Sequence, residues 1–162
     1  TSLLCRPVSV LKRPQLCAMR TNCGWEGISR RMAKPQRVGV AVVEHAGRVL
    51  VGLRRDVATR GGPAEFPGGK CHPNEEPSDC AERECLEETG LPVTAVRLLD
   101  HRVHAYSEVT VEISFWLCRP KDEPFANNAF CGFRFVPVRE LRELPFPAAN
   151  RTTIELLTSE LT

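Results

Sequence analysis

The sequence predicts a single layered domain of mixed α/β (α+β) class. Its 162 residues match the size of one ordinary domain, and a hydrophobic content of 42% is enough for a core. Segments with strand-like and helix-like patterns follow one another along the same chain, as in layered folds. No apolar stretch approaches the ~20 residues that a membrane span needs, so we expect no membrane association.

The first 35 residues differ from the rest in composition. Residues 1–37 hold eight basic side chains and one acidic one, a charge of +7, so the other 125 residues carry −5 of the net +2. We expect residues 1–35 to be a flexible extension, either an organellar leader or sequence upstream of a natural start at Met32. Residues 36–162 would form the folded domain.

The acidic charge of that domain makes it a poor match to a nucleic-acid backbone. We therefore expect a monomer that binds a small molecule and forms no stable complex with nucleic acid. The expected location is the cytoplasm, with import into an organelle through the arginine-rich leader as the alternative.

The first half of the domain predicts a hairpin, a loop and a helix. Residues 37–44 are rich in valine, 45–47 form a turn, and 48–53 return as a second strand. Residues 54–76 are polar and rich in glycine and proline, which favours loop. Residues 77–89 predict a helix, because Pro77 suits its first position and Gly90 suits the left-handed residue after its end.

The second half predicts more strands and a closing helix. Residues 93–105 are strand-like, and apolar and other residues alternate strictly over 109–117. A short strand over 130–136, a helical turn over 139–144 and a helix over 150–161 complete the domain. The eight cysteines lack paired CxxC spacings, which favours free, mostly buried thiols over a zinc site or a disulfide framework.

Three carboxylates carry the chemical signal. Glu84, Glu87 and Glu88 stand at i, i+3 and i+4 of the predicted helix, so they share one surface with Cβ atoms ~5–6 Å apart. Their mutual repulsion would be offset by a hard cation such as Mg²⁺, which prefers oxygen ligands. Three acidic residues can equally form a solvated helix face. The spacing of the surrounding residues distinguishes a metal site from that alternative.

That spacing resembles the Nudix box, Gly-x5-Glu-x7-Arg-Glu-U-x-Glu-Glu-x-Gly-U, with U a bulky apolar residue. Residues 69–91, here called the box, match it at every polar and glycine position; the one departure is Cys85, smaller than the usual aliphatic residue. The resemblance implies an α/β/α sandwich around a mixed sheet, and attack by water on a nucleoside diphosphate linked to another moiety. The matching positions are Gly69, Glu75, Arg83, Glu84, Glu87, Glu88 and Gly90.

The same resemblance implies roles for these residues. Glu84, Glu87, Glu88 and the carbonyl of Gly68 would hold Mg²⁺, with Mn²⁺ as an alternative. Glu84 is our candidate to accept the proton of the attacking water, and Glu75 is expected to support the loop rather than bind metal. Arg83, four residues before Glu87, could fix that carboxylate by a charge-assisted hydrogen bond.

Outside the box the chain resembles MutT-like 8-oxo-dGTP diphosphatases, enzymes of nucleotide-pool sanitation and DNA repair, over roughly residues 36–157. The sharpest marker is Phe146-Pro147-Ala148-Ala149-Asn150. By this resemblance Asn150 would read the base, Phe66 would pack on it, and Arg55 would contact the base region. The alternatives are that Asn150 only caps the last helix and that Phe66 is plain core.

Two departures from that group bear on substrate choice. No acid stands in residues 125–129, where a further metal-binding glutamate is common, and Val109 aligns with a base-contacting arginine. Hydrolysis of another nucleotide, such as a pyrimidine triphosphate or ADP-ribose, is therefore a second hypothesis. A non-catalytic base-reading module is a third, although such modules usually lose the catalytic glutamates.

Overall fold

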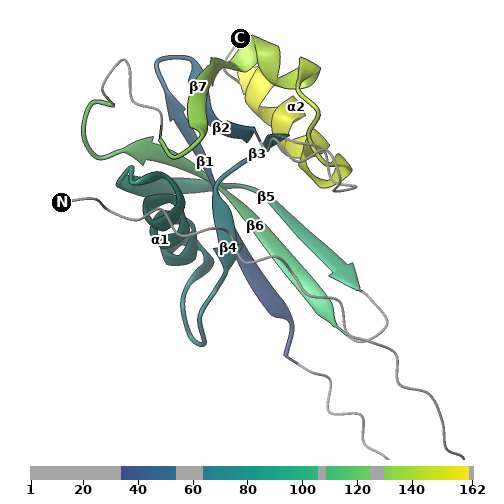
Figure 1. Cartoon of the computed structure of the whole chain (residues 1–162). Coiled ribbons are helices and arrows are strands. Elements are labelled where there is room, and N and C mark those ends of the chain that lie inside the picture. The colour runs from purple at the N-terminus through teal and green to yellow at the C-terminus, as the bar shows by residue number, and fades with distance from the viewer. Residues whose placement is uncertain (1–33, 54–63, 106–108, 125–129, 161–162) are drawn as a thin grey trace, which may run out of the picture.

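The computed structural model describes residues 34–53, 64–105, 109–124 and 130–160. It confirms the mixed fold: one seven-stranded sheet lies between α1 on one face and α2 with the 3₁₀ turns on the other (Figure 1). Within these residues no helix is both long and apolar enough to cross a membrane. The elements are β1 (Gln36–His45), β2 (Arg48–Leu53), β3 (Ala64–Glu65), β4 (Gly68–Lys70), α1 (Pro77–Thr89), β5 (Val93–Ala105), β6 (Thr110–Pro120), β7 (Phe133–Pro137), η1 (Val138–Glu143), η2 (Ala148–Asn150) and α2 (Arg151–Glu160).

Strand β1 organises the sheet, whose strand order is β3-β2-β1-β6-β5. It pairs in parallel with β6, and its first half also pairs antiparallel with β4 through Val38, Gly39 and Val40. The β1–β2 hairpin continues the sheet on the other side, where β7 and β3 join β2. The sheet is mixed because β1–β6 is parallel while the other pairs are antiparallel.

The core has two parts, one on each face of the sheet. Val42 and Phe115 belong to the part that packs under α2, whereas Ala41, Val43 and Cys118 belong to the part under α1. Strand β6 is thus buried on both faces toward its end, because it lies in the middle of the sheet. The alternation of apolar and other residues over 109–117 predicted this strand, but it indicated burial of one face only.

Helix α1 has the predicted bounds and ends. Pro77 stands in its first turn, and Gly90 adopts φ 76° while its N–H donates to the carbonyl of Leu86 at 2.9 Å. One face of the helix is apolar, since Ala81 and Cys85 are fully buried against the sheet. Burial also raises the pKa of Cys85 to about 11, so this thiol serves as a small packing group.

A glycine on β1 allows α1 to lie close to the sheet. A Cβ at Gly39 would stand 2.4 Å from the carbonyl oxygen of Pro77 and 2.8 Å from the nitrogen of Ala81. Both are backbone atoms of the helix, so they have little room to move aside. The approach brings the polar side of α1 over the neighbouring strand β4, which contacts the helix.

The prediction of loop throughout 54–76 was wrong, because β3 and β4 lie inside that range. Both strands are two or three residues long and pair with β1 and β2, which lie far away in the sequence. A Gly-Pro-rich segment carries no local strand signal, so only the tertiary pairing reveals them. The closing helix also begins as the turn η2, and the last short strand begins at Phe133 rather than Phe130.

Candidate active site

The glutamates of α1 lie against two glycines of β4. The backbone N–H of Gly68 donates to Glu88 Oε2 at 3.1 Å. A Cβ at Gly69 would stand 2.4 Å from Glu84 Cδ and 2.5–2.6 Å from its two oxygens. Any side chain at position 69 would therefore occupy the space of the Glu84 carboxylate, and only glycine leaves that carboxylate beside the strand.

Arg83 connects the other carboxylates of the box. Its Nη1 donates to Glu84 Oε1 at 2.8 Å and to Glu87 Oε2 at 3.3 Å. Its Nε and Nη2 donate to the two oxygens of Glu75 at 2.8 and 3.0 Å, a bidentate pair. The hydrogen bonds that Arg83 donates to Glu75, ahead of the one that it donates to Glu84, raise the pKa of Arg83. The guanidinium thus offsets repulsion among three carboxylates and fixes their positions.

Glu75 completes the turn that leads from β4 into α1. Its Oε2 accepts the N–H of His72 at 2.7 Å, and its own N–H donates to the His72 carbonyl at 3.2 Å. Asn74, between them, adopts φ 65°, a left-handed conformation that asparagine tolerates. The hydrogen bonds from Arg83 lower the pKa of Glu75 from 4.5 to about 2. This carboxylate is thus anionic and committed to the loop at neutral pH.

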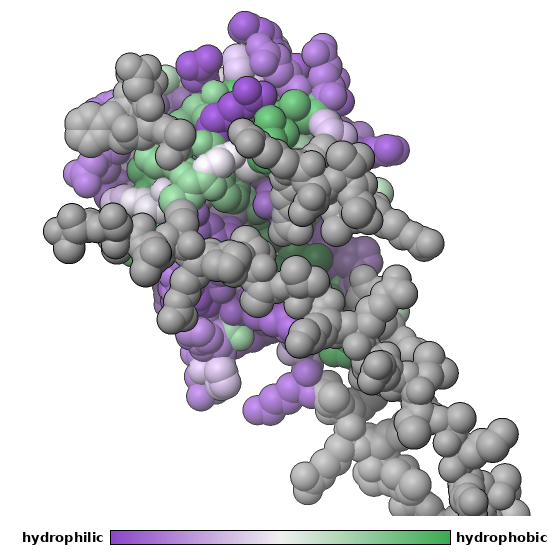
Figure 2. Space-filling model, in the orientation of Figure 1, coloured by the Kyte–Doolittle hydropathy of each residue, from purple (hydrophilic) through white to green (hydrophobic). Residues whose placement is uncertain are grey.

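The three α1 carboxylates differ in exposure. The Glu84 side chain is 17% exposed, whereas that of Glu87 is 59% exposed. Glu84 Oε2 makes no hydrogen bond to the described part of the chain, so it keeps its lone pairs beside Gly69. In Figure 2 the visible surface around α1, β4 and the loop between them is largely hydrophilic, while apolar surface gathers in the upper half of the molecule. The possible metal ligands of α1 are therefore carboxylate oxygen atoms that lie at or near the solvent-exposed surface.

Two aromatic side chains pack together at the start of the segment 64–69, which ends in the two glycines. Phe66 is buried, 7% exposed, and its ring lies 4.7 Å from that of Phe146. The N–H of Ala64 also donates to the carbonyl of Pro145 at 3.4 Å. Residues 64–69 therefore join the Phe146–Asn150 segment to the glycines beside α1. Two residues of extended chain, about 7 Å, separate Phe66 from Gly68.

The half-buried Asn150 ends η2 directly before α2. Its backbone N–H donates to the carbonyl of Pro147 at 3.0 Å, but its side chain makes no hydrogen bond to any described residue. Within the described residues, then, the Asn150 amide does not cap the helix.

The other residues expected near the base are placed as follows. Arg55 falls outside the described residues. Val109 is exposed, and Glu123, an acid that precedes residues 125–129, lies 3.2 Å from His45 Nε2.

Two contacts of this region had no sequence signal. Arg37 Nη2 donates to the carbonyl of Glu75 at 2.7 Å, across 38 residues of chain, and holds the turn against β1. Phe146, which the sequence indicates only as part of the 146–150 motif, forms the aromatic pair with Phe66. Both depend on strand pairing and loop packing that no local pattern encodes.

A mixed sheet lies between helices, and a glutamate-rich helix is held on a glycine strand at one edge of β1. The chain belongs to the Nudix family: the model of the NUDIX domain matches residues 33–157. It is similar to an 8-oxo-dGTP diphosphatase of Proteus vulgaris, 38% identical over 79 residues, which cover 49% of this chain and 70% of the relative. It is also similar to the 8-oxo-dGTP diphosphatase of Buchnera aphidicola, 31% identical over 94 residues, 57% of this chain and 75% of the relative.

Among solved structures, the fold is similar to that of a MutT protein from methicillin-resistant Staphylococcus aureus. The TM-score is 0.62 at 23% identity, over 80% of this chain and 99% of the other. A likeness at this identity shows the common fold. The match to the family model makes the chain a Nudix hydrolase by family.

Proposed function

We propose that the protein hydrolyses oxidised purine nucleoside triphosphates in the presence of Mg²⁺, with 8-oxo-dGTP as the preferred substrate. The products would be 8-oxo-dGMP and pyrophosphate. The observation that carries the proposal is the contact of Glu84 and Glu88 with the glycines of β4, next to a segment that leads to the aromatic pair of Phe66 and Phe146. The names of the two curated relatives agree with this substrate.

The donor set fits a hard divalent cation. Glu84, Glu87, Glu88 and the carbonyl of Gly68 offer only oxygen atoms, and Gly69 leaves the space beside Glu84 open. Mg²⁺ at these residues, or Mn²⁺ in its place, would neutralise the polyphosphate and lower the pKa of an attacking water. The metal would add to the positive charge that Arg83 brings to Glu84 and Glu87.

The protein's own groups would position the reaction and move the proton. Glu75 holds Arg83, and Arg83 holds Glu84 by one oxygen, which leaves Oε2 of Glu84 to accept the proton of the attacking water. Water forms the new bond to phosphorus as the bond to the bridging oxygen breaks. Arg83 here is a positioning residue, because it acts through the carboxylates it contacts.

Asn150 would select the oxidised base. Oxidation at C8 converts guanine N7 from an acceptor to an N–H donor beside the O6 acceptor, and one amide can pair with both. With undamaged guanine, one of the two contacts would meet a lone pair. Such a mismatch in a dry site can discriminate by up to about 10⁴-fold. The amide is available for this role because its side chain has no partner among the described residues.

The test is the ratio of kcat/KM for 8-oxo-dGTP to that for dGTP with Mg²⁺. We expect a large ratio for the native chain and a collapsed ratio for Asn150→Ala, with dGTP turnover largely kept. Ser159→Ala, at the far end of α2, is the matched control and should leave the ratio unchanged. A ratio near one in the native protein would exclude the proposed selectivity.

Catalysis itself is tested separately from base choice. Glu84→Gln and Glu88→Gln should each abolish Mg²⁺-dependent release of pyrophosphate while the protein stays folded. Full turnover in both variants would mean that these carboxylates are not the metal ligands. No turnover of any nucleotide by the native chain would favour a non-catalytic base-reading module.

One observation favours a second substrate class. The position that aligns with a base-contacting arginine is Val109, whose exposed apolar side chain offers no hydrogen bond to a base. Fewer base contacts would permit other nucleotides, such as a pyrimidine triphosphate or ADP-ribose. A panel of nucleotides, scored by chromatography of the nucleoside monophosphate that each releases, separates this alternative from the first.

A further inference from the structure

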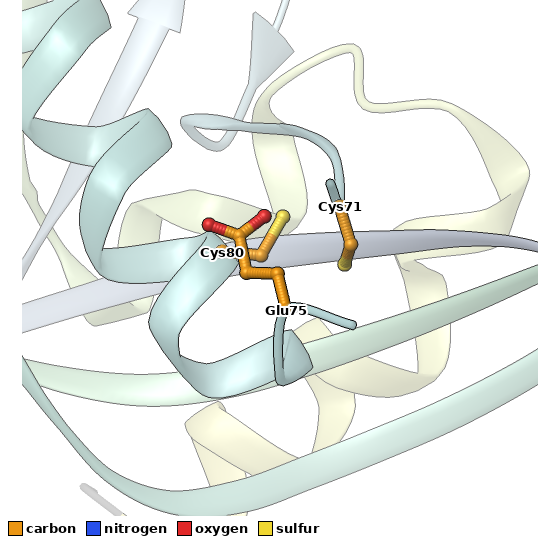
Figure 3. Close-up of side chains that lie close together, drawn as sticks. All are labelled: Cys71, Glu75 and Cys80. Atoms are coloured by element: carbon orange, nitrogen blue, oxygen red, sulfur yellow. The ribbon is translucent and has the colours of Figure 1, made fainter. Parts of the chain in front are cut away.

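Two thiols and a carboxylate lie close together where the chain leads from β4 into α1. Cys71 follows β4, Glu75 ends the turn before α1, and Cys80 stands in the first turns of α1; their side chains converge in Figure 3. The two sulfur atoms and one carboxylate oxygen all lie within 4.8 Å of one another. Cys71 is half-buried and Cys80 is buried. The group is separate from the all-oxygen set of Glu84, Glu87, Glu88 and Gly68.

Sulfur donors differ in chemistry from the ligands that Mg²⁺ prefers. Thiolates together with one nitrogen or oxygen are the ligands of Zn²⁺ and similar thiophilic cations. In a tetrahedral site with zinc–sulfur bonds of about 2.3 Å, neighbouring donor atoms stand about 3.5–3.8 Å apart. The present spacing lies within about 1 Å of that geometry, a change that rotations of the Cys71 and Glu75 side chains, which precede the helix, can supply.

A fourth ligand stands next to Cys71. His72 is 67% exposed, and its Nδ1 lies 4.0 Å from Glu75 Oε2. An exposed ring can turn toward the two sulfurs without breaking core contacts. We propose that Cys71, His72, Glu75 and Cys80 form a second cation site, specific for thiophilic divalent ions of the zinc class, whose occupancy weakens the hydrolase.

The charges around this cluster balance when such an ion is bound. Two thiolates and the Glu75 carboxylate carry one negative charge each, and a divalent ion together with the Arg83 guanidinium neutralises them. Arg83 is already in place, since its Nη2 lies 3.0 Å from Glu75 Oε2 and 3.7 Å from Cys80 Sγ. A bound ion would thus compensate the two thiolates and Glu75, whereas Glu84 and Glu87, which also contact Arg83, depend on the cation of the proposed active site.

The cluster shares two contacts with the proposed catalytic machinery. Glu75 would turn at least one oxygen from Arg83 to the ion, which loosens the group that orients Glu84. Cys80 would lose the S–H that now donates to the carbonyl of Gly69 at 3.4 Å. Both changes act on residues next to the Mg²⁺ ligands, so occupancy should lower turnover. This step rests on the proposed function, whereas binding of the ion does not.

Binding is tested with Co²⁺ as a spectroscopic probe on the full chain, reduced by a non-thiol reductant and kept in excess Mg²⁺. We expect about one equivalent to give a thiolate-to-cobalt charge-transfer band that Zn²⁺ displaces. Cys71→Ser should lose the band, while Cys131→Ser, an exposed thiol outside the cluster, should keep it. An equal band in Cys71→Ser, or no band in the native chain, would overturn the proposal, as would oxidation of the two thiols in place of metal uptake.

Inhibition supplies the second readout. In excess Mg²⁺, Zn²⁺ should inhibit the native chain at concentrations at least tenfold lower than it inhibits Cys71→Ser, whose basal activity should be unchanged. Equal inhibition of both would place the effect of zinc at the Mg²⁺ ligands and overturn the regulatory part. If the cobalt band behaves as expected but no nucleotide is hydrolysed, the proposed function fails while the thiophilic site stands.

Discussion

Replacing Gly69 by alanine tests how tightly the proposed active site is built. The added Cβ would stand 2.4 Å from Glu84 Cδ, whereas nonbonded carbon atoms prefer about 3.5–4.0 Å. The carboxylate must therefore move by about 1 Å or more. A displacement of 1 Å at a reacting group can cost about 100-fold in rate. We expect kcat/KM to fall by about that factor, which equals about 2.7 kcal/mol of transition-state stabilisation.

The assay measures Mg²⁺-dependent pyrophosphate release together with thermal unfolding. Gly69 lies outside the left-handed region, so alanine adds no backbone strain, and the cost in stability should stay within about 1–3 kcal/mol. Gly52→Ala is the control, because its Cβ would stand 2.7 Å from the Phe133 ring rather than from a carboxylate. It should lower stability and keep kcat/KM. If Gly69→Ala stays folded and retains activity within about threefold, catalysis does not require the present position of the Glu84 carboxylate beside Gly69.

Two further predictions concern stability. Glu75→Gln removes the bidentate pair with Arg83 and should cost roughly 1.5–3 kcal/mol at pH 7. Because the folded pKa of Glu75 is about 2, below its ordinary 4.5, this stabilisation is complete above about pH 4.5 and is lost as the pH falls toward 2. Urea midpoints of native and variant chains should therefore converge at low pH; a constant difference would contradict the ion pair. Gly39→Ala should destabilise by about 3 kcal/mol, since its Cβ would meet two backbone atoms of α1, and a native-like melting temperature would show that the helix can shift.

The sequence by itself determined the elements whose signals are local. Helix α1 has the predicted bounds because proline and glycine mark its ends and small residues mark its buried face. The spacing of Gly69, Glu75, Arg83 and the three glutamates identified the family, because that spacing is fixed by one turn and one helix. The β1–β2 hairpin and strand β6 followed from valine content and alternation.

Only the tertiary structure decided which of these groups meet. Strands β3 and β4 form because β1 and β2 offer them partners, so a Gly-Pro segment without strand propensity still joins the sheet. The pairing places Gly69 under Glu84 and brings Cys71 to Cys80; the spacing in the sequence marks Gly69 and Glu84 as members of one motif but does not show that either pair is in contact. Local patterns fix helices and turns because their hydrogen bonds join near neighbours. The site depends on contacts between segments far apart in the chain, which exist only after the sheet has formed.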